Sequence, residues 1–310
     1  MGIVVFGAVF VDIKGYPIAQ YIPGGRNVGR ISQVHGGVSR NIAEDIANVE
    51  LRPTFVSVVE DSGVDRDVVE RLRKHKVNTE YISIREDGLG TWLAVFDNSG
   101  DVVASISKRP DLSAIGELLD KKGDEIIRNA DSVIVEIDLE APILKRIFKL
   151  SAKYGKQIYA VVSNMSIALE RRDLMQKTGC FVCNEQEAGQ LFSEDFNSIS
   201  AEGMLEILPK KIRQARIEKM VVTMGEKGAV YASLDGEEGI CPAQDVHVID
   251  TTGAGDSFFA GVAIGLTYGK TLAEACTIGT RLAASVICTK ENVCPRFQPA
   301  EFDLEPIHDI

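Results

Sequence analysis

The sequence lacks the features that mark a surface for nucleic acid or an anionic membrane. It has 34 Lys and Arg against 45 Asp and Glu, for a formal net charge of −11, and no basic run. Because phosphate contacts dominate nucleic-acid affinity, we predict no nucleic-acid partner. The most apolar stretch, Met1–Val11, is shorter than the about 20 residues that span a bilayer, so we expect a buried strand there and no membrane partner.

Cysteine is scarce as well, with 6 residues in a chain of 310. Cys180 and Cys183 form one CxxC pair with no second pair at zinc-finger spacing, which favours buried thiols over a metal site. A chain of this length can bury a sizeable core and does not need disulfides to stabilise its fold. We therefore expect a reducing, cytoplasmic environment.

The chain has no low-complexity linker and no internal repeat, so we interpret residues 1–310 as one domain. Apolar strand-like runs alternate with helical patterns, which predicts an α/β fold with a mostly parallel sheet covered on both faces. The expected strands include Ile3–Phe10, Thr54–Val59, Ser132–Ile137, Gln157–Val162, Cys180–Val182, Met220–Met224, Gly228–Ser233 and Gly239–Val248. The expected helices include Ser39–Val49, Asp65–His75, Ala141–Tyr154, Glu185–Leu191, Ala201–Ala215, Ala254–Leu266 and Leu272–Ile287.

Two regions, about 14–35 and 78–108, interrupt this alternation. The second reads as three short strands, Thr79–Arg85, Thr91–Asp97 and Asp101–Ser107, and the turn after Asp97 has hairpin chemistry. We predict that the two regions form a small antiparallel β lid over a site. The alternative is an extension of the edge of the main sheet.

The most informative stretch, DTTGAGDSFFAG, runs from Asp250 to Gly261 between a strand-like run and a helical one. Gly253, Ala254 and Gly255 lie where unpaired backbone N–H groups gather at a helix N-terminus, which makes an anion site. Asp256 stands in the first helical turn, and we expect the helix terminus to keep its pKa low. A plain N-cap is the alternative, but a cap requires neither the paired glycines nor the two threonines.

Other polar residues follow predicted strands or open predicted helices. Gly36 and Gly37 precede a helix that contains Asn41, and Asp12 closes the first strand. Ligands of open α/β sheets bind beyond the carboxyl ends of the strands, where these residues are expected to meet. Taken alone, a cap or turn role explains each of them better.

Two further motifs follow strands. Asn184 and Glu187 open a helix, where an amide and a carboxylate could hold hydrated Mg²⁺ near a nucleotide or could be ordinary helix-start residues. Thr223, Gly225 and Gly228 form either a β-turn or a loop that lines a nucleotide.

Together these motifs resemble the ribokinase/PfkB family of carbohydrate kinases over nearly the whole chain. The resemblance implies a ribokinase-like, doubly wound sheet with a β lid, and transfer of the γ-phosphoryl group of ATP to a primary hydroxyl with Mg²⁺. It implies that Asp256 is the base beside an anion hole of Gly253, Ala254 and Gly255. It places the acceptor against Asp12, Gly36, Gly37, Arg40, Asn41, Trp92 and Asp138, and the nucleotide against Asn184, Thr223, Gly225, Gly228 and Thr252. It assigns Mg²⁺ to Glu187 and a monovalent cation such as K⁺ to Asp250.

The acceptor is predicted from finer similarities. Arg40 before Asn41 looks like the pseudouridine kinase branch, although Lys108–Asp111 departs from that branch. Trp92 could stack on a nucleobase, belong to the lid core or form a subunit contact in a homodimer through the lid. Arg40 could read a base carbonyl or pair with Glu44. We predict a ribose-bearing nucleoside, pseudouridine first; the alternatives are a free-sugar kinase (ribose, fructose or ketodeoxy-sugar type) and a non-catalytic binding protein on the same fold.

Overall fold

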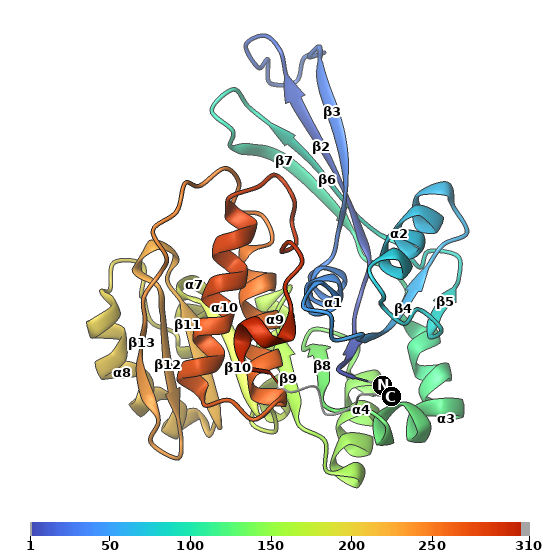
Figure 1. Ribbon diagram of the computed structural model, residues 1–310. Coiled ribbons are helices and arrows are strands. Elements are labelled where there is room, and N and C mark those ends of the chain that lie inside the picture. Colours follow the sequence, from blue (N-terminus) through green and yellow to red (C-terminus); the bar gives the residue numbers. More distant parts are fainter. Residues whose placement is uncertain (1, 305–310) are drawn as a thin grey trace.

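The computed structural model describes residues 2–304. A large sheet lies between two layers of helices, and a small sheet projects from one end of it (Figure 1). The strands from β11 to β5 run parallel, while β12 and β13 add antiparallel at one edge. The order across the sheet is β13 (Glu238–Cys241), β12 (Ala229–Ser233), β11 (Lys219–Thr223), β10 (Cys180–Asn184), β9 (Ile158–Val161), β8 (Val133–Glu136), β1 (Val4–Phe6), β4 (Thr54–Val59) and β5 (Ile82–Ile84).

The strands are apolar on both sides because each sheet face is covered by helices. Val133 and Val135 of β8 point into one core, and Ile134 between them points into the other. The first core packs against α3 (Ser113–Arg128), α4 (Ala141–Tyr154), α5 (Met165–Ala168), α6 (Arg172–Met175), α7 (Glu185–Phe192) and α8 (Ala201–Ala215). The second packs against α1 (Val38–Asn48), α2 (Gly63–Lys74), α9 (Ala254–Thr267) and α10 (Leu272–Ile287). The predicted doubly wound α/β fold is confirmed.

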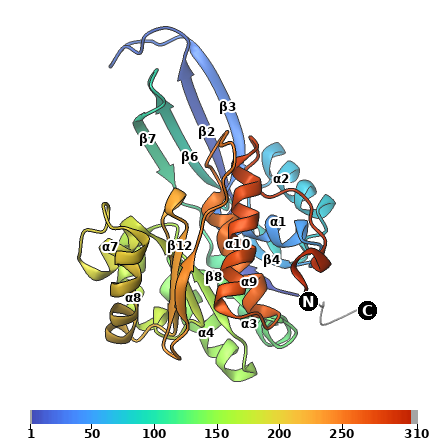
Figure 2. The same cartoon turned by 60° about the vertical axis from the view of Figure 1, so that its left-hand side comes forward.

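The small sheet has the order β3 (Gly29–Gly36), β2 (Phe10–Pro17), β6 (Gly90–Phe96) and β7 (Val102–Lys108). It consists of two antiparallel pairs joined by a parallel pairing of β2 with β6. Asp12 pairs with Trp92, and Trp92 pairs with Ser107, so the three side chains share one face. Figure 2 shows this sheet standing away from the helical layers.

Three predicted strands differ from the structure. The run Ile3–Phe10 is not one strand, because β1 ends at Phe6 and Phe10 already begins the small sheet. Gly7 lies in the gap, where an added Cβ would come within 2.0 Å of Ser39 Oγ. Asp12 therefore lies inside β2 and does not close a strand of the large sheet.

The other two differences concern partners and length. Thr79–Arg85 was predicted in the small sheet, but its strand, β5, pairs parallel to β4 at the edge of the large sheet. The predicted strand Gly239–Val248 is reduced to β13, which ends at Cys241. Within residues 2–304, no helix is long and apolar enough to cross a membrane.

Candidate active site

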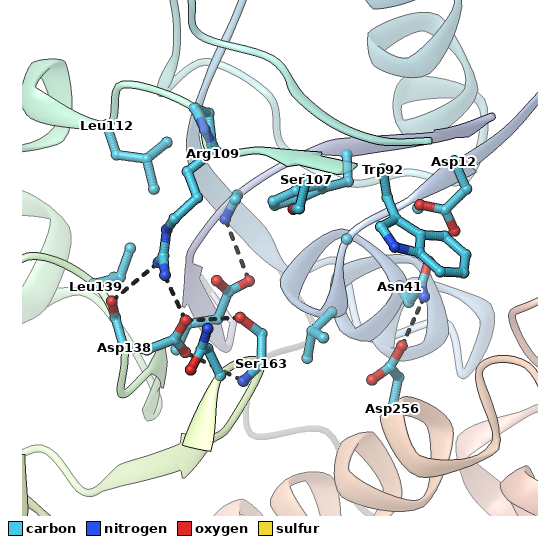
Figure 3. A pocket seen from close by; sticks show the side chains of 18 of the residues that line it. Asp12, Asn41, Trp92, Ser107, Arg109, Leu112, Asp138, Leu139, Ser163 and Asp256 are labelled. Atoms are coloured by element: carbon cyan, nitrogen blue, oxygen red, sulfur yellow. Dashed lines mark hydrogen bonds and ion pairs between the residues drawn. The ribbon is translucent and has the colours of Figure 1, made fainter. Parts of the chain in front are cut away.

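A cavity of about 790 Å³ opens between the small sheet and the carboxyl ends of the large sheet's strands (Figure 3). It is the location expected for ligands of open α/β folds. Nine of the predicted site residues line it: Asp12, Gly36, Gly37, Asn41, Trp92, Asp138, Thr252, Gly253 and Asp256. Segments far apart in the sequence thus meet at one site.

Asp256 projects into this cavity from the first turn of α9. Gly253 caps the helix with a φ of 83°, and a Cβ there would lie 2.1 Å from the Asn292 carbonyl oxygen, so only glycine fits. Asn41 Nδ2 donates a hydrogen bond of 2.7 Å to Asp256 Oδ2. Burial raises the pKa of Asp256 to about 6, against the lowering effects of Asn41 and of the nearby Arg40 charge. The expectation of a low pKa was wrong, because desolvation of the carboxylate outweighs the stabilisation that its neighbours provide.

The start of α1 carries the second predicted group. Gly37 precedes this helix with a φ of 99°, and a Cβ there would lie 2.8 Å from the Ala8 carbonyl oxygen. A Cβ on Gly36 would lie 3.0 Å from both carboxylate oxygens of Asp12, so the glycine permits this close approach. Burial raises the pKa of Asp12. Two carboxylates, Asp12 and Asp256, therefore face one cavity on either side of Asn41 (Figure 3).

Arg40 does not line the cavity, which corrects its prediction as a substrate contact. Its side chain is 1% exposed and donates to Glu44 Oε2 at 2.7 Å and to the His35 carbonyl oxygen at 2.6 Å. Glu44 is fully buried and also accepts from Arg71 at 2.8 Å. Of the two alternatives for Arg40, the pairing with Glu44 four residues on is thus correct. Arg40 also links α1 to the end of β3 through the His35 carbonyl oxygen.

Asp138 lies at the opposite end of the cavity from Asp256 (Figure 3). Its buried carboxylate accepts hydrogen bonds from the Ser163 hydroxyl at 2.8 Å and from the Ser163 backbone N–H at 3.2 Å. Arg109 Nη2 lies 3.3 Å from Asp138 Oδ2. Both carboxylate oxygens of Asp138 thus have protein partners, which hold its side chain in place at the cavity wall.

Among the residues that line the cavity and were missed from the sequence are Glu136 and Asn292. Glu136 accepts from the backbone N–H groups of Ala8 at 3.3 Å and Ser39 at 3.1 Å, and it ties β8 to the start of α1. Burial and the charge of Asp138 raise the pKa of Glu136 to about 7. Asn292 donates to Asn41 Oδ1 at 3.2 Å. Glu136 sits within a predicted strand and Asn292 in an irregular segment, so neither carried a local signal.

The predicted nucleotide residues lie along neighbouring strand ends. Asn184 closes β10 and stands in register with Thr223 at the end of β11. Gly225 and Gly228 both have positive φ, at 58° and 89°, and bracket the turn that follows β11. This turn continues the edge at which the cavity opens, although these residues do not line the cavity itself.

Asn184 and Glu187 form a capping box at the start of α7. The Glu187 carboxylate accepts from the Asn184 backbone N–H at 2.8 Å, and the Asn184 side chain accepts from the Glu187 N–H at 2.8 Å. Burial raises the pKa of Glu187, and its charge in turn contributes to the raised pKa of Asp256. Glu187 itself does not line the cavity that contains Asp256.

Asp250 precedes the glycine loop, which consists of Gly253, Ala254 and Gly255 at the start of α9. Its Oδ1 accepts from the Thr252 backbone N–H at 2.8 Å. Burial opposes the ionised form of Asp250, but the hydrogen bonds with Thr252 prevail and lower its pKa. Within the described part of the chain, no group of three or more acidic, His or Cys side chains is arranged to hold a metal ion without other ligands.

Comparison with known proteins identifies relatives that match nearly the whole chain. The profile of the pfkB family carbohydrate kinases matches residues 2–296. A guanosine-inosine kinase of Exiguobacterium acetylicum is 34% identical, over 94% of this chain and 95% of that protein. A pseudouridine kinase of Escherichia coli is 24% identical, over 88% of this chain and 86% of that protein.

Among solved structures, Arabidopsis thaliana ribokinase complexed with ribose and ATP is similar with a TM-score of 0.83. The match covers 95% of this chain and 96% of that one at 21% identity, which establishes a shared ribokinase-like fold. Kinases of this family transfer a phosphoryl group from ATP. The chain therefore belongs to the pfkB family of carbohydrate kinases and is a phosphotransferase that acts on a hydroxyl group.

Proposed function

We propose that the protein transfers the γ-phosphoryl group of ATP to the 5′-hydroxyl of a ribonucleoside, guanosine or inosine first. The observation that carries this proposal is the extent of the cavity, which has polar groups at two ends (Figure 3). Asp12, Asn41 and Asp256 at one end suit the hydroxyls of a ribose. The other end leaves room for a base, and a volume of about 790 Å³ falls in the range of sites for ligands larger than a bare pentose.

Asp256 is the proposed general base. Its carboxylate faces the cavity, and a pKa of about 6 leaves it mostly ionised at neutral pH, ready to accept the hydroxyl proton. Gly253, Ala254 and Gly255 present backbone N–H groups at the start of α9, where the charge of the transferring phosphoryl group develops. A Cβ at Gly255 would meet no heavy atom within 4 Å, so open space remains there for the phosphoryl oxygens.

Asn184, Thr223, Gly225, Gly228 and Thr252 are proposed to line the nucleotide. Four of them lie at or just after the ends of β10 and β11, and Thr252 lines the acceptor cavity next to the glycine loop. A nucleotide bound along these residues would extend its terminal phosphate toward Asp256, as in-line transfer requires.

The residues also fit a magnesium ion held mainly by the nucleotide. Mg²⁺ keeps several waters and commonly takes one or two carboxylates together with substrate phosphates, so a complete protein cage is not expected. Glu187 supplies a carboxylate whose charge raises the pKa of Asp256. When bound, the ion would neutralise charge on the phosphates. We also propose a monovalent cation such as K⁺ near Asp250, whose lowered pKa favours the ionised carboxylate.

Pseudouridine is the second candidate acceptor. The resemblance of the Gly36–Asn41 segment to the pseudouridine kinase branch and the 24% identity to an Escherichia coli pseudouridine kinase support it. Guanosine and inosine rank first because the relative named for them is 34% identical over 94% of this chain.

We further propose a homodimer formed through the small sheet. Trp92 and Ser107 face the cavity, so their neighbours Leu93 and Ile106, which pair across β6 and β7, face outward. These two side chains are 41% and 69% exposed, and Ile31 on β3 is exposed as well. Exposed apolar side chains that share one face suit contact with an identical copy of that face. Light scattering should report a dimer for the wild type and a monomer for Ile106→Asp. A monomeric wild type would refute the proposed dimer.

We also propose a cytoplasmic location, because the 6 free cysteines suit a reducing compartment.

The test of the acceptor is a competition assay. Guanosine, inosine, pseudouridine, ribose and fructose are offered together with ATP and Mg²⁺, and each phosphorylated product is quantified by mass spectrometry. Guanosine or inosine should give the highest kcat/KM. A preference of about tenfold or more for a free sugar, about 1.4 kcal/mol of transition-state discrimination, would contradict the nucleoside proposal but not the family assignment.

A further inference from the structure

The end of the cavity away from Asp256 contains an arginine that the phosphoryl chemistry does not use. Arg109 follows β7, Asp138 follows β8 and Ser163 follows β9, and their side chains converge there (Figure 3). The Arg109 side chain is 51% exposed, whereas the Asp138 side chain is fully buried. A cation from the small sheet is thus anchored on a carboxylate of the large sheet.

Only one nitrogen of Arg109 is engaged by this anchor. Nη2 donates to the Asp138 carboxylate and to the Asp138 carbonyl oxygen, both at 3.3 Å. Within residues 2–304, no acceptor takes the N–H groups on Nε and Nη1. Asp138 is itself held by Ser163 through two hydrogen bonds. The guanidinium is therefore fixed in place while part of its donor fork stays free at the cavity wall.

A second arginine lines the same cavity. Arg171 follows Ser163 in the segment after β9, and its side chain is 17% exposed. Its Nε is buried and has no hydrogen-bond partner in the described chain. Its Nη1 lies 3.5 Å from Glu170, whose side chain is 73% exposed, so the pairing is weak. A buried donor without a partner costs free energy that a ligand's acceptor would recover.

Apolar side chains complete the surroundings of these donors. Leu112 and Leu139 lie near Arg109, Ile167 also lines the cavity, and Trp92 lines it nearer Asp12 and Asn41 (Figure 3). Apolar walls with donors at the rim suit a flat ring that carries acceptors on one edge.

We infer that Arg109 and Arg171 read the carbonyl-bearing edge of the acceptor's base, so that the site selects 6-oxopurines over 6-aminopurines. The inference rests on the proposed function, because it takes the acceptor to be a nucleoside. Guanosine and inosine present the O6 and N7 acceptors that an arginine fork matches in two hydrogen bonds. Adenosine presents an amino donor in place of O6, and a guanidinium has no acceptor to receive it. Asp138 is a positioning residue for Arg109.

The inference is tested with Arg109→Met and Arg109→Lys, with Lys108→Met as the matched control. Lys108 is the adjacent cation, but it pairs with Glu60 at 2.9 Å and Asp87 at 2.8 Å and does not line the cavity. The measured quantity is kcat/KM for inosine, adenosine and ribose, together with the KM for ATP. We expect Arg109→Met to lower kcat/KM for inosine by about 10- to 100-fold, with little change for ribose or ATP.

The charge-conserving variant separates recognition of a base edge from simple charge attraction. Arg109→Lys keeps the charge but loses the planar fork, so it should also reduce the preference for inosine over adenosine. Arg171→Met should reduce that preference too, and Lys108→Met should leave it unchanged.

The outcomes distinguish this inference from the proposed function. If the wild type phosphorylates nucleosides but Arg109→Met and Arg171→Met keep its preference for inosine, the inference is overturned and the proposed function stands. If the wild type phosphorylates only free sugars, both fail. If a phosphorylated sugar such as fructose 6-phosphate outcompetes the nucleosides, the arginines bind phosphate, and the inference is again overturned.

Discussion

Replacing Asp256 with asparagine isolates the proton-accepting role proposed for this carboxylate. In the wild type, Asp256 Oδ2 accepts a 2.7 Å hydrogen bond from Asn41. An asparagine can offer its amide oxygen to the same donor, so the position of the side chain should be retained. What it loses is the basic oxygen that takes the hydroxyl proton. General bases contribute about 10²- to 10⁴-fold, so kcat should fall by that factor, which corresponds to about 3–5 kcal/mol of activation free energy.

The pH dependence of the wild type gives an independent measure of the same group. Burial raises the pKa of Asp256 to about 6, and only the ionised carboxylate accepts a proton. The kcat/KM of the wild type should therefore be highest above that pH and fall about tenfold per pH unit below it. Asp256→Asn should lack this acidic limb while its residual activity stays low.

The assay is the initial rate of ADP formation from about pH 5 to about pH 9, with ATP binding measured by calorimetry. Asp245→Asn, an exposed aspartate earlier in the same segment, is the matched control and should keep wild-type rates. Near-normal turnover of Asp256→Asn, with ATP binding intact, would refute the assignment of the base. An unchanged acidic limb in the variant would attribute that limb to another group.

Three further predictions concern the metal, the anion hole and a buried carboxyl. Glu187→Gln should shift the Mg²⁺ titration of activity to higher concentration, and an unchanged titration would leave Glu187 as a helix cap only. Gly255→Val should keep the wild-type melting temperature, since nothing lies within 4 Å of the added Cβ, yet lose turnover; retained turnover would refute the anion hole. Burial raises the pKa of Asp45 to about 8, so the folded state holds a proton that the unfolded chain releases above about pH 4, and this group lowers stability as pH rises toward 8. Asp45→Asn should remove a slope of up to about 1.4 kcal/mol per pH unit from urea unfolding free energies, and an unchanged slope would contradict the assignment.

The parts of the site that the sequence predicted are those carried by contiguous residues. Gly253–Gly255 and Asp256 lie between a strand-like run and a helix, so their placement at a helix start follows from local pattern. The Asn184–Glu187 spacing likewise identified a helix start. For such motifs, the local backbone geometry already determines which groups point at a ligand.

The parts that the sequence did not predict depend on contacts between distant segments. Whether Arg40 faces the substrate or Glu44 is decided by the burial of α1, which no local pattern reports. In the sequence, Glu136 looks like any other residue of a buried strand. Only the fold shows that it accepts hydrogen bonds from the backbone N–H groups of Ala8 and Ser39. The pKa of Asp256 was misjudged for the same reason, since desolvation depends on the whole surrounding fold.

The pairing partner of a short strand is also difficult to predict from the sequence. Strand β5 has three residues, and its sequence would suit either the small sheet or the edge of the large one. The choice follows from packing: Ser57 of β4 pairs with Ile82, which leaves β5 parallel at the edge of the large sheet. Local propensity predicts that a strand forms more reliably than it predicts which strand it pairs with.

The most direct test of the account is identification of the product formed from inosine, ATP and Mg²⁺ by the purified protein. Tandem mass spectrometry against a synthetic standard distinguishes phosphorylation at the 5′-position from phosphorylation at the other ribose hydroxyls. The account predicts inosine 5′-monophosphate in amounts equal to the ADP released, and its loss with Asp256→Asn. ADP release without a phosphorylated nucleoside, or a nucleoside phosphorylated at a secondary hydroxyl, would contradict the account.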